Sequence, residues 1–432
     1  MNTSEKFKEF LSNIKIPEDK ANTISYRYGR ITKNLNEKFR DTSSKTNNHL
    51  QVGSYGRYTG IKSISDLDML YIMPDSEWDT YKNGGQYKLL SDVKESLEST
   101  YFSSDIKVDR CVVTINYSDN SHIDVQPVFE EERQDYKYPD TSNGGSWKIT
   151  KPKKEMAAMK EFSDNKNKNL RRLCKMARAW KNKNGVVMKG LLIDTLAYNF
   201  LKETTDYDDT SYSSYDKMSR DFFKFLYDQP KDQKEYGALG SKQRVKVIKS
   251  FRRKAKKAYD LACKAIDAEK DKEKHQKWRD IYGKEFPSYS EAVNEAKVMN
   301  FSYNSTEEFI EDLYKVDIRY NLEIDCEVKQ NGFREYFLRE MLKRNFPLLT
   351  SKSLKFFIKE NEVPAPYEVK WKVINRGEEA IKRNCERGQI LNDAGNHIRF
   401  ENTDFSGEHY VECYIIKDNI VVARDFIDVP IR

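Results

Sequence analysis

Apolar residues near the start of the chain recur at the spacing of a helix. Within the polar stretch of residues 19–40 they fall at Ile24, Tyr28, Ile31 and Leu35, three or four positions apart. Residues at this spacing share one face of an α-helix. The pattern predicts a long helix that packs a single stripe against a core.

The pattern changes twice further along the chain. From Gly53 to Phe129, short runs predict strands around one helix near Tyr87–Ser99; they read LDMLYIM, IKVDRCVVTINY and HIDVQPVF. From Lys153 to Tyr282 the spacing is almost entirely helical. A second change falls between Gly283 and Asn304, and alternating runs beyond it, such as YEVKWKVIN and HYVECYIIKD, again predict strands.

We therefore predict an α+β protein with two domains. Residues 1–290 form the first, with a core at about 45–150 behind an N-terminal helix and a helical lobe at 151–290. Residues 300–432 form the second, a β-sandwich-like domain. Its candidate core members are Val369, Trp371, Val373, Val411, Cys413 and Ile415.

Composition narrows the class of protein. The chain has 432 residues, of which 34% are charged, and no run approaches the roughly 18–20 apolar residues that a membrane helix needs. Its six cysteines stand apart without a CxxC pair, which argues against a disulfide framework or a zinc site. We expect a cytoplasmic protein without membrane contact. The net charge of +7 favours a phosphate-bearing ligand but does not require a nucleic acid.

Three carboxylates are the strongest candidates for chemistry. Asp66 and Asp68 lie two positions apart on a predicted strand, so they share one face. Asp124, within SHIDVQP, could join them from an adjacent strand. Carboxylates so close repel one another, and a divalent cation with oxygen ligands, such as Mg²⁺, relieves that repulsion. Asp124 could help such a metal to activate a hydroxyl, or act as its base.

The turn before these carboxylates suits a phosphate. Gly53 and Ser54 offer backbone N–H groups and a hydroxyl where a helix is predicted to begin. A lone DxD is more often a solvated strand edge, and a Gly-Ser pair alone is weaker still. The two together, followed by a third carboxylate on a later strand, predict in-line nucleotidyl transfer with two metal ions.

The same segments resemble a known family. GSYGRYTGIKSISDLDMLYIM followed by HIDVQPVF is similar to the DNA-polymerase-β-like nucleotidyltransferases, and more narrowly to the cGAS/DncV-like enzymes (CD-NTases) of bacterial anti-phage (CBASS) signalling. The lobe segments NLRRLCKMARAWKNKN and VVMKGLLIDTLAYNFL also resemble them. The tail, with VPAPYEVKWKVINRGEEA and VARDFIDV, resembles the AGS-C sensor domain fused to some of these enzymes. One departure is Val52, where several relatives carry Gln directly before the Gly-Ser pair.

The resemblance implies a fold and an activity. The fold is a polymerase-β-like core with a spine helix and a helical lobe. The activity is synthesis of a cyclic or short linear oligonucleotide second messenger from NTPs, ATP among them, with release of pyrophosphate. Asp66, Asp68 and Asp124 would be catalytic and hold two Mg²⁺ ions, for which Mn²⁺ could substitute. Gly53 and Ser54 would bind phosphates, as would Lys175 or Arg178, because relatives carry a phosphate-binding cation on the helix at 169–183.

The resemblance also implies partners, and the sequence leaves two rival functions open. A downstream effector would sense the product, and nucleic acid is a partner that the sequence leaves open. Residues 242–257 form a basic stretch with an apolar stripe at helical spacing, through Val245, Ile248, Phe251 and Ala255, which predicts an amphipathic helix. The rivals are a transferase of the same fold that nucleotidylates RNA, a small molecule or a protein, and a binding protein with a decayed site.

Overall fold

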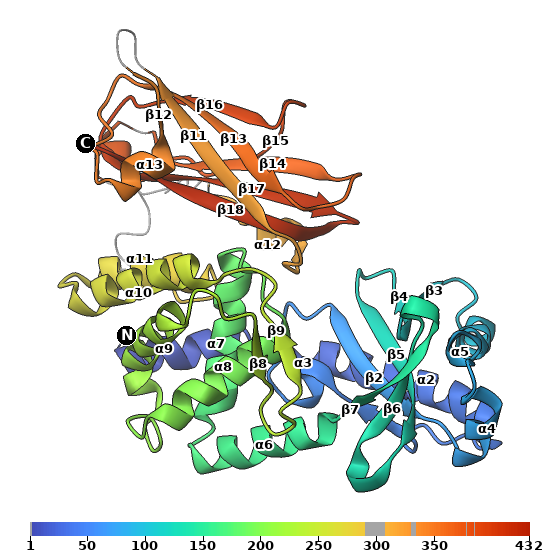
Figure 1. The fold of residues 1–432 in the computed structure, drawn as a ribbon. Coiled ribbons are helices and arrows are strands. Elements are labelled where there is room, and N and C mark those ends of the chain that lie inside the picture. Colours follow the sequence, from blue (N-terminus) through green and yellow to red (C-terminus); the bar gives the residue numbers. More distant parts are fainter. Residues whose placement is uncertain (1, 290–306, 330–333, 377, 384) are drawn as a thin grey trace, which may run out of the picture. The chain divides into compact units, whose positions relative to one another are not determined.

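The computed structural model describes residues 2–432 apart from 290–306, 330–333, 377 and 384 (Figure 1). Contacts divide the chain into two compact units that are not contiguous in sequence. The first contains residues 1–179, 188–269 and 285–287, and the second contains 180–187, 270–284 and 288–432. The predicted boundary between residues 290 and 300 lies outside the described residues.

A mixed sheet forms the centre of the first unit. Its strands follow the order β1-β2-β5-β4-β3, with β2 and β5 parallel and the other neighbours antiparallel. The run IKVDRCVVTINY is a hairpin that turns at Arg110, whose φ is 47°. The bounds are β1 His49–Gln51, β2 Asp66–Ile72, β3 Asp105–Asp109, β4 Val112–Asn116 and β5 His122–Glu130. A ribbon of β6 Tyr136–Asp140 and β7 Ser146–Thr150 extends from β5.

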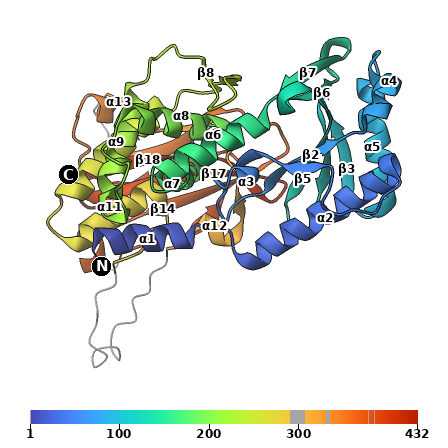
Figure 2. The ribbon, with the colours of Figure 1, turned by 90° about the horizontal axis from the view of Figure 1, so that it is seen from below.

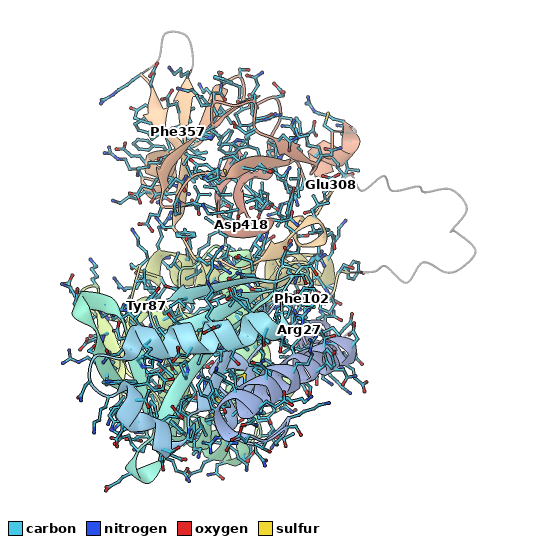
Figure 3. The ribbon with its side chains drawn as sticks, turned by 90° about the vertical axis from the view of Figure 1, so that its right-hand side faces the viewer. Arg27, Tyr87, Phe102, Glu308, Phe357 and Asp418 are labelled. Carbon is cyan, nitrogen blue, oxygen red and sulfur yellow. The ribbon has the colours of Figure 1, made fainter. Side chains whose placement is uncertain are left out.

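Two helices cover one face of this sheet, α2 (Glu18–Arg40) and α5 (Gln86–Thr100). Figure 3 shows Arg27 on α2 and Tyr87 and Phe102 near the two ends of α5. The stripe predicted on α2 is buried in a cluster with alternate residues of β2. The members of that cluster include Ile24, Tyr28, Ile31, Leu35, Leu67, Met69 and Tyr71. The opposite face of β2 is therefore left for its polar residues.

The helical lobe of the first unit contains α6 Pro152–Asn165, most of α7 Asn169–Lys183, α8 Gly190–Glu203, α9 Tyr215–Asp228 and α10 Arg252–Asp267. The first helix, α1 (Thr3–Asn13), packs on the lobe (Figure 2). Its Phe7 meets Tyr215 of α9 edge to face, with ring centroids 6.2 Å apart. No helix in the described part of the chain is long and apolar enough to cross a membrane.

The prediction of one helix over residues 242–257 is wrong. The strand β9 (Arg244–Lys246) pairs with β8 (Glu235–Gly237), and α10 begins only at Arg252. Val245 is buried from the strand, whereas Ile248 is 50% exposed. The β-branched residues Val245 and Val247 favour extended structure, and hairpin pairing overrides the helical spacing.

Two sheets packed face to face form the second unit, which confirms the predicted sandwich. One sheet has the order β10-β18-β17-β14-β15 and the other β12-β11-β13-β16. The six predicted core residues all lie in the shared cluster. The strands are β10 Lys315–Val316, β11 Leu322–Lys329, β12 Tyr336–Phe337, β13 Ser353–Asn361, β14 Glu368–Ile374, β15 Ile390–Asn392, β16 Ile398–Asn402, β17 Gly407–Lys417 and β18 Ile420–Ile431.

Helical segments outside the sandwich also belong to the second unit. They are the last turn of α7 and α11 (Asp271–Tyr282), which the sequence places in the helical lobe. The Arg376 guanidinium contacts Asp280 on α11 at 3.0 Å, and the Asn184 amide donates to the carbonyl of Ile281 at 2.8 Å. Polar contacts therefore explain a grouping that the sequence spacing does not reveal.

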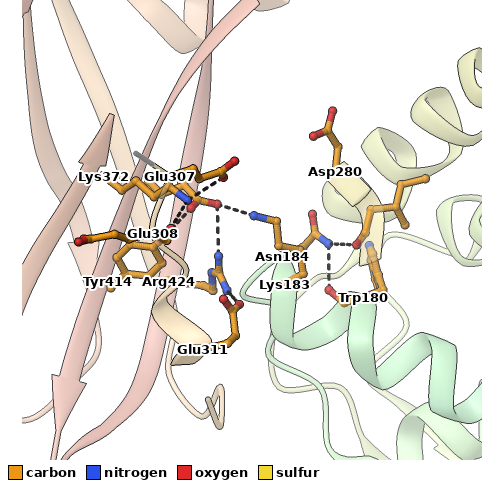
Figure 4. A network of polar contacts seen from close by, with 12 residues as sticks. Trp180, Lys183, Asn184, Asp280, Glu307, Glu308, Glu311, Lys372, Tyr414 and Arg424 are labelled. Atoms are coloured by element: carbon orange, nitrogen blue, oxygen red, sulfur yellow. Dashed lines mark hydrogen bonds and ion pairs between the residues drawn. The ribbon is translucent and has the colours of Figure 1, made fainter. Parts of the chain in front are cut away.

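Glu412 on β17 is buried within a polar network of the second unit. Figure 4 labels Lys183, Arg424 and Glu311 of this network. Lys183 lies 2.7 Å and Arg424 3.2 Å from its Oε1, and Arg424 also pairs with Glu311 at 2.7 Å. Burial would raise the pKa of Glu412, but Lys183 and Arg424 hold that pKa well below its usual range. The carboxylate is thus kept ionised by cations from two different elements.

We predict that Lys183→Met lowers the melting temperature, because Glu412 would lose one of its two ion pairs and keep the pair with Arg424 and the weaker influence of Lys372. Breaking a buried pair completely costs about 3–5 kcal/mol, so a loss on the order of 2 kcal/mol is expected. Adding Glu412→Gln should restore part of it. Thermal denaturation of the two single variants and the double variant measures this coupling, and additive losses would contradict it.

Candidate active site

Three aspartates meet where β2 pairs with β5. The parallel register sets Asp66 opposite His122 and Asp68 opposite Asp124. Paired residues project from the same face of a sheet. Because the alternate residues of β2 face α2, the three carboxylates project from the face that α2 does not cover. The structure thus places the predicted carboxylates on one face.

Like charge and burial set the electrostatics of this face. Burial, followed by the charges of Asp66 and Asp124, raises the pKa of Asp68 to about 7, against an opposing effect of Arg57. Burial also raises the pKa of Asp124, although its hydrogen bond with Thr114 opposes the rise. In that bond the Thr114 hydroxyl donates to Asp124 Oδ1 at 2.6 Å. The other oxygen of Asp124 is left for a ligand.

The donor set suits a divalent cation. The described residues hold no group of three or more His, Cys, Asp or Glu side chains at the spacing of a ready-made metal site. The fit is electrostatic: Asp66 and Asp124 raise the pKa of Asp68, and a cation beside these carboxylates would relieve the repulsion. Hard carboxylate oxygens on a few protein groups are ligands that Mg²⁺ accepts.

The Gly-Ser turn lies directly against Asp68. It forms the short helix α3 (Gly53–Gly56), and the Val52 N–H donates to the Asp68 carbonyl at 3.1 Å. Gly53 has a φ of 64°, and a Cβ there would lie 1.8 Å from Asp68 Oδ2. Only glycine permits both the left-handed backbone and this approach. The first N–H groups of α3, at Gly53 and Ser54, have no acceptor within the helix.

A buried cluster that the sequence analysis missed holds this turn to the lobe. Asp194 on α8 accepts from Arg57 Nε at 2.8 Å and from Arg178 at 2.6 and 3.0 Å. Burial raises the pKa of Asp194, but Arg178 and Arg57 bring it down to about 2. Its signal in the sequence was an aspartate inside the apolar run GLLIDTLA, since a charge buried there must be paired.

The two cations predicted to hold phosphate lie in different surroundings. Arg178 is 7% exposed and engaged with Asp194. Lys175, one turn earlier on α7, is half-buried, and its pKa is lowered by burial and by Lys15, Arg171 and Arg178. Whether either side chain contacts a substrate stays a prediction.

Two family models match the chain. The Second Messenger Oligonucleotide or Dinucleotide Synthetase domain matches residues 1–163, and the Adenylyl/Guanylyl and SMODS C-terminal sensor domain matches residues 304–432. Together they cover more than half of the sequence. The chain is a cGAS/DncV-like nucleotidyltransferase. The resemblance is thereby confirmed, and this nucleotidyltransferase makes cyclic oligonucleotide second messengers from nucleoside triphosphates. Enzymes of the family use divalent metal ions.

Solved structures of other nucleotidyltransferases resemble part of this chain. CdnC of E. coli MS115-1, in a complex with HORMA-deltaN, has a TM-score of 0.52 at 15% identity over 66% of this chain and 98% of its own. CdnG of Bradyrhizobium diazoefficiens with GTP has 0.48 at 12%, over 65% and 96%. DncV of Vibrio cholerae with a linear intermediate has 0.47 at 14%, over 56% and 70%. The likeness to CdnC confirms the predicted fold class. A search of the curated proteins found no match.

We predict that Gly53→Ala lowers turnover on the order of a hundredfold, because its Cβ would displace the Asp68 carboxylate by about an ångström or more. Gly84→Ala is the matched control: φ is 75° there, but a Cβ would meet nothing within 4 Å. Both variants place alanine in the left-handed region of backbone conformation. Steady-state kinetics separates the two effects, and equal turnover in both variants would show that the close approach is unimportant.

We predict a pH-dependent gain in stability from Asp68→Asn in metal-free protein. The folded pKa of about 7 lies above the unfolded value of about 3.9, so ionised Asp68 destabilises the fold most above pH 7. The gain should be full at pH 8 and shrink as the pH falls from 7 toward 4, where the native carboxyl is protonated. Melting curves in EDTA across this range measure it, and a gain independent of pH would contradict it.

Proposed function

We propose that the three aspartates and the Gly-Ser turn form a two-magnesium centre for nucleotidyl transfer. The observation that supports this most directly is the position of the Asp68 carboxylate. It shares a sheet face with Asp66 on its own strand and with Asp124, its partner on β5, and it lies against Gly53 of the turn. Asp66 and Asp68 would hold both ions, and Asp124 would complete the nucleophile side. Bound Mg²⁺, or Mn²⁺ in its place, would neutralise phosphate charge and lower the pKa of the attacking hydroxyl.

The chain's own groups then have distinct tasks. The oxygen of Asp124 that Thr114 does not contact is placed to accept the proton of a ribose hydroxyl. The N–H groups of Gly53 and Ser54 and the Ser54 hydroxyl would hold the donor phosphates. Lys175 or Arg178 would add positive charge on the lobe side. Since Arg178 is bound to Asp194, its substitution would report on that buried cluster as well as on phosphate.

The product would be a cyclic or short linear oligonucleotide, with ATP among the substrates and pyrophosphate released. In the cytoplasm it would switch on an effector in anti-phage defence, as the family resemblance implies. All of the proposed site residues lie in the first unit, so we propose that the sandwich serves recognition and regulation. The rival function, transfer to RNA, a small molecule or a protein, no longer has a continuous basic helix at 242–257 to support it.

We predict that Asp66→Asn combined with Asp68→Asn abolishes product formation from radiolabelled NTPs while the protein stays folded. Both amides keep the shape of the side chain but lose the anionic oxygens that Mg²⁺ requires. In the wild type, NTP and Mg²⁺ together should raise the melting temperature by more than the sum of their separate effects. The double variant should lose that extra increment.

Asp105→Asn is a matched control, because it removes an exposed carboxylate from β3, which β4 separates from β5 and its Asp124. It should keep both the product and the increment. Turnover near the wild-type rate in the Asp66→Asn, Asp68→Asn variant would overturn the metal centre. A product that phosphatase degrades completely, or a label transferred to RNA or protein, would favour the rival function.

A further inference from the structure

A large hollow lies on the α2 side of the central sheet. Its volume is about 840 Å³, and its walls come from α2, β1, α3, α6, α7 and the segment after α1, all within the first unit. Its cationic side chains are Lys15, Arg30, Lys45 and Lys175, and its lining includes no aspartate or glutamate. We call this hollow the α2 groove.

The α2 groove and the aspartates lie on opposite faces of the sheet. His49 and Gln51, which line the groove, pair with Tyr71 and Met69 of β2. Residues paired across strands share a face, and Tyr71 and Met69 face α2. Asp68 alternates with them and faces the other way. A ligand in the α2 groove would therefore not occupy the proposed metal centre.

The cations of the groove lack carboxylate partners. None of Lys15, Arg30, Lys45 and Lys175 forms an ion pair with an acidic side chain in the described part of the chain. Arg30 donates to the carbonyl of Thr100 and lies over the Tyr101 ring. Burial and the neighbouring cations lower the pKa of Lys175, so a bound anion would relieve an existing repulsion. Cations gathered without counter-charge attract a ligand with more than one negative charge.

Tyrosine rings supply the other half of the recognition surface. Tyr26, Tyr28, Tyr55 and Tyr58 line the groove, and the Tyr26 and Tyr58 side chains are 65% and 68% exposed. Tyr28 is buried, with its ring parallel to His49 at an interplanar angle of 2°. Exposed aromatic faces beside cations favour a flat aromatic body that carries charge at one end.

We propose that the α2 groove is a second ligand site, for an aromatic polyanion of nucleotide size, which binds without a metal ion. A volume of about 840 Å³ is in the range of small-molecule sites, about 300–1,000 Å³. A lysine ammonium acts as a point charge and does not form the paired hydrogen bonds of an arginine guanidinium. The site would therefore favour ligands by their total negative charge and by an aromatic ring. Of the two cations proposed above for the substrate phosphates, Lys175 lines this groove. If the groove is a separate site, the role at the metal centre falls to Arg178, and the groove proposal otherwise does not depend on that function.

The test is metal-free binding, with ATP as the probe. Titration calorimetry of the full chain in EDTA compares three ligands. ATP carries both the charge and the aromatic ring, inorganic tripolyphosphate carries the charge alone, and adenosine carries the ring alone. ATP should bind clearly more tightly than either. The variant Lys15→Met with Lys45→Met removes two groove cations and should weaken ATP binding roughly tenfold, because the polyphosphate would lose two of the groove's four cationic side chains.

The matched control is Lys33→Met with Lys94→Met, two lysines of the same unit that pair with Glu37 and Glu98 away from the groove. It removes the same charge and should bind ATP as the wild type does. The proposal is overturned if metal-free ATP does not bind, if tripolyphosphate binds as tightly, or if both variants weaken ATP equally. It is also overturned if Asp66→Asn with Asp68→Asn abolishes the binding and the groove variant does not.

Discussion

The carboxylate of Asp194 is the buried charge on which the arrangement of the first unit depends. Its side chain is 0% exposed and accepts hydrogen bonds from Arg57, Arg178 and Thr59. An ionised group without water is tolerated only when every partner is in place. Since Arg57 directly follows α3 and Arg178 lies on α7, one carboxylate fixes the Gly-Ser turn relative to the helices of the lobe.

The aspartates on the sheet follow the opposite logic. No ion pair reaches Asp66, Asp68 or Asp124 from the described residues. Burial, and then the charges of Asp66 and Asp124, raise the pKa of Asp68. Nearby arginines are committed to Asp194 instead. Asp194, which organises the fold, is thus neutralised by arginines, whereas Asp66, Asp68 and Asp124, which would bind metal, are not. The folded state therefore has a built-in affinity for a cation.

The sequence was informative wherever a residue's neighbours in the chain determine its surroundings. The stripe through Ile24 and Leu35 predicted α2, and the alternation around Asp66 and Asp68 predicted which face they share. Pairing between distant segments was not predictable in the same way. The sequence offered Arg178 only as a candidate phosphate cation, whereas in the fold Asp194 of α8 pairs with it. Likewise, α11 joins the second unit through contacts such as that of Asp280 with Arg376. Such contacts leave no periodic signal, because each depends on one side chain rather than on a face.

The contact between Gly53 and Asp68 has a consequence for surveys of related genomes. Aspartates are easy to score in a sequence, but they can persist after a site has decayed. In any relative that shares this turn, a residue with a Cβ at the position of Gly53 would collide with the aspartate oxygen, 1.8 Å away here. A residue other than glycine at that position would therefore mark a copy whose aspartate arrangement differs from the one described here, whatever its number of acidic residues.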